Sequence, residues 1–153
     1  MSQQDVELWR PCSPRSPQLI PEMCDPEVVW VEDPTRADSR TYRGHDGVRA
    51  SWERWLENFD EYGFEVESMS DHGDRVLVTG VEHGRGRASG AEVSARVYVL
   101  CTFRAGKILR YQEFYEEQDA LAALEPLAVA TADRRRSVTS GRCPECGRQT
   151  ARI

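Results

Sequence analysis

The chain has 153 residues and a formal net charge of −6, which is the size of one domain with a modest tail. Hydrophobic residues make up 39% of it and charged residues 30%, which fits a globular protein and excludes a disordered chain. The excess of acids disfavours general nucleic-acid binding, because an acidic body repels phosphates. No apolar run approaches the about 20 residues of a membrane helix, and the first residues lack a secretory pattern. We therefore expect a cytoplasmic protein without a membrane partner.

Residues 1–23 form a proline-rich N-terminal segment, with four prolines between positions 11 and 21. Proline lacks a backbone donor and disfavours helix in the residue before it. We expect at most one short helical turn before Pro11 and irregular chain after it.

A strand and a helix are predicted next. The run 28–33 is β-branched and aromatic, ends in a carboxylate and stops at a proline, which is typical of a strand. Segment 35–44 is a predicted polar loop. Apolar residues then recur at helical spacing over 48–60, which predicts an amphipathic helix with Trp52 and Trp55 on its apolar face.

An antiparallel meander follows the helix. Glycine-containing turns separate four strand-like segments, at 64–70, 75–82, 92–104 and 107–115. A short closing helix is predicted over 116–125. A strand, a helix and then a meander in this order indicate an α+β fold with a curved antiparallel sheet.

Five segments in chain order carry a resemblance to a known family. They are DPEVVW (25–30), VEDP (31–34), YRGHDGVR (42–49), GDRVLV (73–78) and FRAGKILR (103–110). Together they resemble the nuclear transport factor 2-like superfamily, in its SnoaL-like polyketide cyclase and ketosteroid isomerase branch. The resemblance implies a cone, in which a strongly curved sheet wraps helices around an apolar pocket, and a homodimer formed through the sheet.

The domain organisation follows from this resemblance. The SnoaL-like domain is expected over 24–125, after the irregular segment 1–23 and before a flexible basic tail over 126–153. Members of the family usually open with a long amphipathic helix, whereas prolines occupy that region here.

The resemblance suggests Asp33 as the catalytic base. In ketosteroid isomerases a Val-Glu-Asp-Pro stretch carries the proton-shuttling aspartate at a strand end, and residues 31–34 match it. A carboxylate at the rim of an apolar cone would have the reach and the shifted pKa that a general base needs. In the alternative, Asp33 caps the turn before Pro34 and has no catalytic role.

Alternation along the last strand places Tyr111, Glu113 and Tyr115 on one face. The resemblance suggests that this face looks into the cone, where burial would raise the pKa of Glu113. Asp33 and Glu113 would then act as base and acid, with Tyr111 or Tyr115 donating to a developing enolate oxygen. In the alternative, Glu113 faces solvent or an arginine at a dimer surface, because one β-bulge reverses the alternation.

Five residues are candidates for substrate binding: Val31, Trp52, Trp55, Val99 and Tyr115. Core packing is the alternative for the two tryptophans. Ketosteroid isomerases carry a protonated acid near the position of Val99 and a tyrosine on the first helix. Both are missing here, which disfavours steroid isomerisation itself.

The tail contains Cys143-Pro144-Glu145-Cys146, which offers two of the four ligands of a zinc site. A second pair would have to come from a dimer mate, so we expect neither a metal nor a cofactor.

The sequence predicts a SnoaL-like pocket protein for a small apolar molecule. Its expected activity is cofactor-independent proton transfer, of isomerase, cyclase or hydrolase type, on a carbonyl compound. The alternative is a non-catalytic ligand-binding or dimerisation module of the same fold, which an incomplete cone favours because it excludes water poorly.

Overall fold

The computed structural model describes residues 17–125 of the chain, and every structural statement below concerns these residues. The predictions for 1–16 and for the tail over 126–153, including Cys143 and Cys146, lie outside the described residues. Between residues 17 and 125, no helix is long and apolar enough to cross a membrane.

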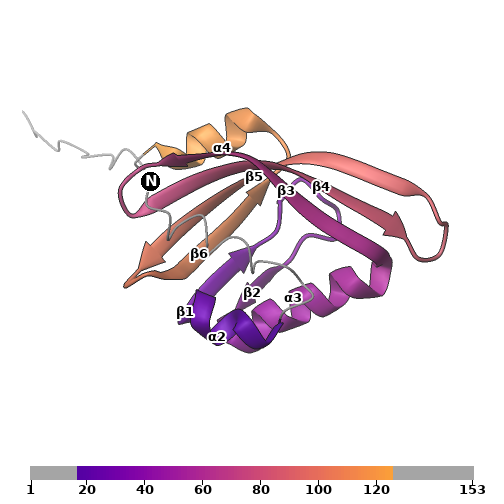
Figure 1. The fold of residues 1–153 in the computed structure, drawn as a ribbon. Helices are drawn as coiled ribbons and strands as arrows, with labels where there is room; N and C mark the ends of the chain where they lie inside the picture. Colours follow the sequence, from indigo (N-terminus) through magenta and orange to yellow (C-terminus); the bar gives the residue numbers. More distant parts are fainter. Residues whose placement is uncertain (1–16, 126–153) are drawn as a thin grey trace, which may run out of the picture.

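One strongly curved sheet dominates the structure (Figure 1). Its six strands lie in the order β2-β1-β6-β5-β4-β3. The predicted antiparallel meander over β3 to β6 is confirmed, and β1 adds to it in parallel with β6. The strands are β1 (Cys24–Val31), β2 (Thr41–Arg43), β3 (Phe59–Asp71), β4 (Arg75–Gly86), β5 (Glu92–Arg104) and β6 (Lys107–Phe114).

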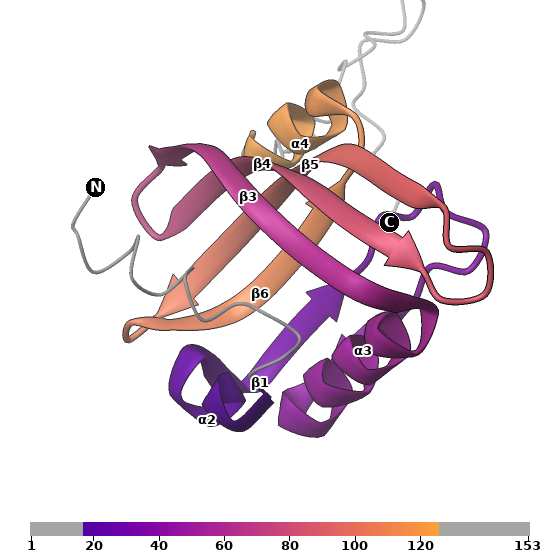
Figure 2. The same ribbon diagram turned by 45° about the vertical axis from the view of Figure 1, so that its right-hand side comes forward.

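Helices cover both faces of this sheet (Figure 2). On the concave face lie α3 (Gly44–Asn58) and the short α2 (Ile20–Met23), which follows the 3-10 turn η1 (Pro17–Leu19). On the opposite face, α4 (Glu117–Leu124) packs on a smaller apolar cluster of β4, β5 and β6. The sheet does not close on itself, and the arrangement is the α+β cone that the sequence predicts.

Three aromatic rings fill one part of the concave side. Trp30 of β1 stacks on Tyr111 of β6, with ring centroids 3.6 Å apart and planes 2° from parallel. Trp52 of α3 meets Trp30 edge-on, at 6.1 Å between centroids and 78° between planes. All three side chains are buried, and such ring pairs contribute about 0.5–1.5 kcal/mol each beyond their area burial. These rings fix α3 against the sheet.

Several segments differ from the sequence-based expectation: β3 begins at Phe59, inside the predicted helix 48–60, and β4 continues to Gly86, beyond the predicted end at residue 82. Residues 17–23 form helical turns where we expected irregular chain, because Pro21 lies in the first turn of α2, where a backbone N–H has no helical partner to lose. Ile20 and Met23 are buried in the main core, and this burial stabilises the turn. The short strand β2 lies within the predicted loop 35–44 and pairs with β1.

Gly80 of β4 allows β3 to bend closely over the sheet. A Cβ at this position would lie 2.5 Å from the backbone oxygen of Glu65 and 2.6 Å from the ring of Phe64. The pairing of β3 with β4 shifts register between Val66 and Ser68, beside this contact. The close approach of β3 to β4 therefore leaves no room for a side chain at position 80.

We expect Gly80→Ala to destabilise the protein by about 1–3 kcal/mol, because the new methyl group would overlap backbone that cannot move freely. Urea unfolding followed by circular dichroism measures this change. Ser68→Ala, at an exposed position of β3, is the control and should change the free energy of unfolding by less than about 0.5 kcal/mol. Equal stability of the two variants would refute the steric role of Gly80.

Candidate functional site

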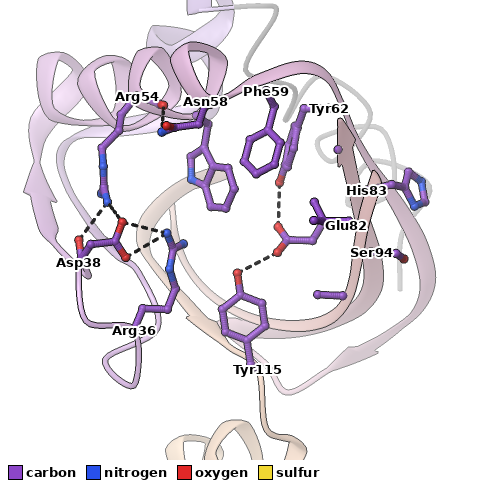
Figure 3. A pocket seen from close by; sticks show the side chains of 14 residues that line it. Arg36, Asp38, Arg54, Asn58, Phe59, Tyr62, Glu82, His83, Ser94 and Tyr115 are labelled. Carbon is purple, nitrogen blue, oxygen red and sulfur yellow. Dashed lines mark hydrogen bonds and ion pairs between the residues drawn. The ribbon is translucent and has the colours of Figure 1, made fainter. Parts of the chain in front are cut away.

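A pocket of about 430 Å³ opens on the concave side, at the end of α3 and next to β4, β5 and the residue that follows β6. Three aromatic rings form one wall: the ring of Trp55 lies 5.2 Å from that of Phe59 and 5.4 Å from that of Tyr62. The polar side chains that face this wall include Arg36, Glu82 and Tyr115 (Figure 3). The pocket combines an aromatic surface with a few polar groups, as small-molecule sites usually do.

Glu82 is the buried carboxyl group of the pocket wall, to which the exposed Asp38 also contributes. The Tyr115 hydroxyl donates to its Oε1 at 2.8 Å, and the Tyr62 hydroxyl donates to its Oε2 at 3.2 Å (Figure 3). Burial raises the pKa of Glu82 above its ordinary value, although the two tyrosine hydrogen bonds act in the opposite direction. Burial also raises the pKa of both tyrosines, and nearby carboxylates add to the shift, so both remain donors at neutral pH.

Three strands bring this group together. On β4 the alternate residues Val76, Val78 and Glu82 are buried, and the first two belong to the main core on the concave side. Tyr62 comes from β3 and Tyr115 follows β6 directly. We did not single out Glu82 from the sequence, although the alternation of β4 places it on the face of the core valines.

Glu113 of β6 is almost completely buried beside Arg36. The Arg36 Nη1 atom lies 4.0 Å from Glu113 Oε1, and neither atom has a hydrogen-bond partner within residues 17–125. Burial and the negative charge of Glu82 raise the pKa of Glu113 to about 8, and Arg36 counteracts part of this rise. Glu113 is therefore largely protonated and neutral at pH 7.

The loop between β1 and β2 carries Arg36 and Asp38 to the pocket. The guanidinium of Arg36 lies 4.9 Å from the centre of the Trp55 ring and 3.2 Å from Asp38. Asp38 also pairs with Arg54 of α3, and Arg54 Nη1 donates to the buried Glu32 at 3.0 Å. These ion pairs hold the loop against α3.

Asp33 is buried, and its two oxygens accept three hydrogen bonds. Its Oδ1 accepts from the backbone N–H of Thr35 at 2.6 Å and from the Thr35 hydroxyl at 2.5 Å. Its Oδ2 accepts from the backbone N–H of Tyr115 at 2.6 Å. Burial raises the pKa of Asp33, but these hydrogen bonds and the charge of Arg36 outweigh it, and the net pKa lies below the ordinary value. The carboxylate thus clamps the loop after β1 to the end of β6.

The structure separates the residues that we expected at one site. Trp55 and Tyr115 line the pocket, whereas Trp52, Val99 and Tyr111 are packed in the core. Val31 alternates with Trp30 on β1 and therefore faces away from the core rings. Asp33 and Glu113 lie buried close to the pocket and are not part of its wall. Their catalytic roles stay predictions.

Within residues 17–125, no group of three or more histidine, cysteine or acidic side chains is arranged to hold a metal ion.

Comparison with known proteins places this geometry in a family. A family model described as the SnoaL-like domain matches residues 9–111. No curated protein matches the sequence. Among solved structures, an NTF2-like protein from Burkholderia thailandensis E264 is similar, with 26% identity and a TM-score of 0.66. The match covers 81% of this chain and 96% of that one.

Two further solved structures share the fold at lower identity. One is a protein from Mesorhizobium loti named as a SnoaL-like polyketide cyclase, with 18% identity, a TM-score of 0.62 and coverage of 75% of this chain and 100% of that one. The other has a ketosteroid isomerase-like fold, comes from Catenulispora acidiphila DSM 44928 and was solved in complex with trimethylamine. It is 17% identical, with a TM-score of 0.59 and coverage of 69% and 79%.

The raised pKa of Glu113 predicts a stability that falls as the pH rises. Its pKa is about 8 in the folded protein and near 4.5 in the unfolded chain, so the folded state binds the extra proton between these values. The free energy of unfolding should therefore fall by up to about 1.4 kcal/mol per pH unit from pH 5 to pH 8 through this group. Chemical unfolding of the wild type and of Glu113→Gln at each pH measures the contribution.

The side chain introduced by Glu113→Gln cannot ionise, so the free energy of unfolding of this variant should lack this part of the pH dependence. Glu82 contributes to the pH dependence of both proteins. Parallel pH profiles of the two proteins would contradict the assigned shift.

Proposed function

The chain belongs to the SnoaL-like domain family, and from this premise we propose that it catalyses cofactor-independent proton transfer on small, largely apolar carbonyl compounds. One observation carries the proposal: a carboxyl group, Glu82, lies in the wall of an aromatic pocket and is held by two tyrosine hydroxyls. A positioned carboxylate with a raised pKa in a largely apolar site is suited to act as a general base.

The pocket supports a flat, apolar ligand. The rings of Trp55, Phe59 and Tyr62 offer a surface for an aromatic or polycyclic compound. The neighbours named as a polyketide cyclase and as having a ketosteroid isomerase-like fold suggest the same class of reaction. At 17–18% identity they establish the fold alone, and the residues of this chain must carry the chemistry.

The proposed reaction begins with the transfer of a proton from the carbon next to the carbonyl group to the Glu82 carboxylate. The electron pair of the broken C–H bond moves to the carbonyl oxygen and forms an enolate. In a β,γ-unsaturated ketone the enolate is conjugated, and return of the proton from Glu82 to the γ-carbon gives isomerisation. Attack of the enolate carbon on a second carbonyl group gives ring closure, and the proton held by Glu82 passes to the new alkoxide oxygen. Neither outcome needs an oxidant or a cofactor.

We place the base at Glu82 and not at Asp33 on electrostatic grounds. The Asp33 oxygens accept three hydrogen bonds, and its lowered pKa makes it a weak base. Glu82 lines the pocket, and its pKa is shifted in the useful direction. Glu113 remains the acid partner of the proposal, because it is protonated at neutral pH.

A second candidate function is ligand binding without catalysis. Both Glu82 oxygens already accept a hydrogen bond, which is also the arrangement of a structural buried acid.

Formation of a homodimer and location in the cytoplasm stay predictions.

Exchange of carbon-bound protons tests the proposal without knowledge of the natural substrate. We expect the wild type to accelerate deuterium uptake from D₂O at the carbon next to the carbonyl group of 2-tetralone, followed by NMR. Glu82→Gln should lower this rate by about 100-fold or more, because the amide cannot take the proton. Glu92→Gln, at an exposed position of β5, is the matched control and should leave the rate unchanged.

Undiminished exchange in Glu82→Gln would exclude Glu82 as the base. Saturable binding of 2-tetralone to the wild type without any exchange would instead support the non-catalytic function.

A further inference from the structure

Small residues surround Glu82 on the concave face of the sheet. Gly80 and Gly84 are its neighbours on this face of β4, and Ala95 is its direct cross-strand partner on β5. Gly84 and Ala95 line the pocket together with Glu82. Three positions beside the proposed base therefore carry at most a methyl group.

Packing accounts for both glycines. A Cβ at Gly84 would lie 2.6 Å from Cδ1 of Phe59, so this ring lies directly on the backbone of β4. A Cβ at Gly80 would meet the ring of Phe64 and the backbone oxygen of Glu65. Side chains and backbone of the fold itself thus cover β4 on both sides of Glu82.

Ala95 differs from the glycines, because the space above it is the pocket. It is half-buried and lines the pocket wall. Val93, the next residue of β5 on this face, also lines the pocket, and 49% of it is exposed to solvent. Ala95 and Val93, which we call the β5 strip, form an apolar path from Glu82 to the rim of the pocket.

The sheet also narrows beside the β5 strip. The pairing of β5 with β6 begins at Tyr98 and Phe114, so the strip has a neighbouring strand on the β4 side and lies beyond the end of β6 on the other. A ligand that extends past Glu82 along β5 therefore reaches the open side of the pocket.

We propose that the β5 strip is a subsite for the second ring of a fused-ring ketone, and that Ala95 determines how large a substrate the protein accepts. The ring that carries the carbonyl group lies between the aromatic wall and Glu82, and the next ring covers Ala95 and Val93. The inference rests on the proposed function and deepens it, because it names the substrate class as ketones with two or more fused rings.

The two residues of the strip act through different physical effects. Removal of the exposed Val93 side chain from water favours a ligand that is long enough to cover it. Ala95 leaves the space that such a ligand occupies. A leucine at position 95 would fill this space and stop the second ring, whereas a single ring on the aromatic side would stay clear of it.

Two ketones of different size test the strip through their binding to the full chain. In titrations followed by NMR, we expect the wild type to bind 2-tetralone, which has two fused rings, about tenfold or more tightly than cyclohexanone, which has one. Ala95→Leu should weaken binding of 2-tetralone by about tenfold or more and change that of cyclohexanone by less than about twofold. Ala91→Leu, the same substitution at an exposed position just before β5, is the matched control and should bind both ketones as the wild type does.

Val93→Ser tests the strip through polarity instead of size. It should weaken binding of 2-tetralone by about threefold to tenfold, because the second ring loses an apolar contact, and leave cyclohexanone unchanged. Val66→Ser, at an exposed valine of β3, is its matched control. Val93→Ser adds no bulk, so it keeps the proposal testable if Ala95→Leu fails to fold.

Equal affinity of the wild type for the two ketones, or no measurable binding of either, would overturn the β5 strip. An unchanged ratio of the two affinities in Val93→Ser and in folded Ala95→Leu would also overturn it. Because these readouts measure binding, they can support the strip even if Glu82→Gln leaves proton exchange unchanged. Conversely, proton exchange that depends on Glu82 can persist if the strip is wrong.

Discussion

The candidate site depends on the hydrogen bonds of one buried carboxylate, that of Asp33. This group joins the loop after β1 to the first residue after β6, through Thr35 on one side and the backbone N–H of Tyr115 on the other. The loop carries Arg36, and the end of β6 carries Glu113 and Tyr115. Without this clamp, the Tyr115 hydroxyl would lose its fixed distance to Glu82, and Arg36 would lose its position opposite Glu113. Asp33 thus positions the site without touching the pocket.

Four buried acids lie on this side of the sheet, and they are compensated to different degrees. Glu32 pairs with Arg54 and accepts further hydrogen bonds, and Asp33 accepts three. Glu82 receives only neutral hydroxyl donors, and Glu113 has an arginine that stays 4.0 Å away. Burial of a carboxylate is costly unless it is paired, so the last two acids shift toward their neutral forms. The acids with a structural role have charged or backbone donors, whereas the two acids assigned to chemistry are compensated less.

Local sequence patterns predicted most of the fold and only part of the site. Alternation placed Glu113 on one face of the last strand with Tyr111 and Tyr115, and the family resemblance suggested that this face looks inward. The predicted strand 75–82 ended at Glu82, and this position at a strand end offered no reason to place the residue inside the sheet. Arg36 lies in a loop without periodicity, and only tertiary ion pairs bring it to the pocket. Asp33 accepts hydrogen bonds from Thr35, as the turn-capping alternative expects, yet another of its partners lies 82 residues further along the chain. Such contacts have no signal in a single sequence.

Strand register also limited what the sequence could reveal. The sequence has Val99 near the position where ketosteroid isomerases carry an acid. The absence of an acid at this position argued against steroid chemistry. In the structure Val99 is the direct cross-strand partner of Glu113. Directly opposed residues have Cβ atoms about 4.5–5.5 Å apart, so a carboxyl does lie at this level of the cone, on the neighbouring strand. The stacked rings of Trp30 on β1 and Tyr111 on β6 fill the core beside this level, which leaves the space beside Trp55 as the place where a ligand can come near this acid.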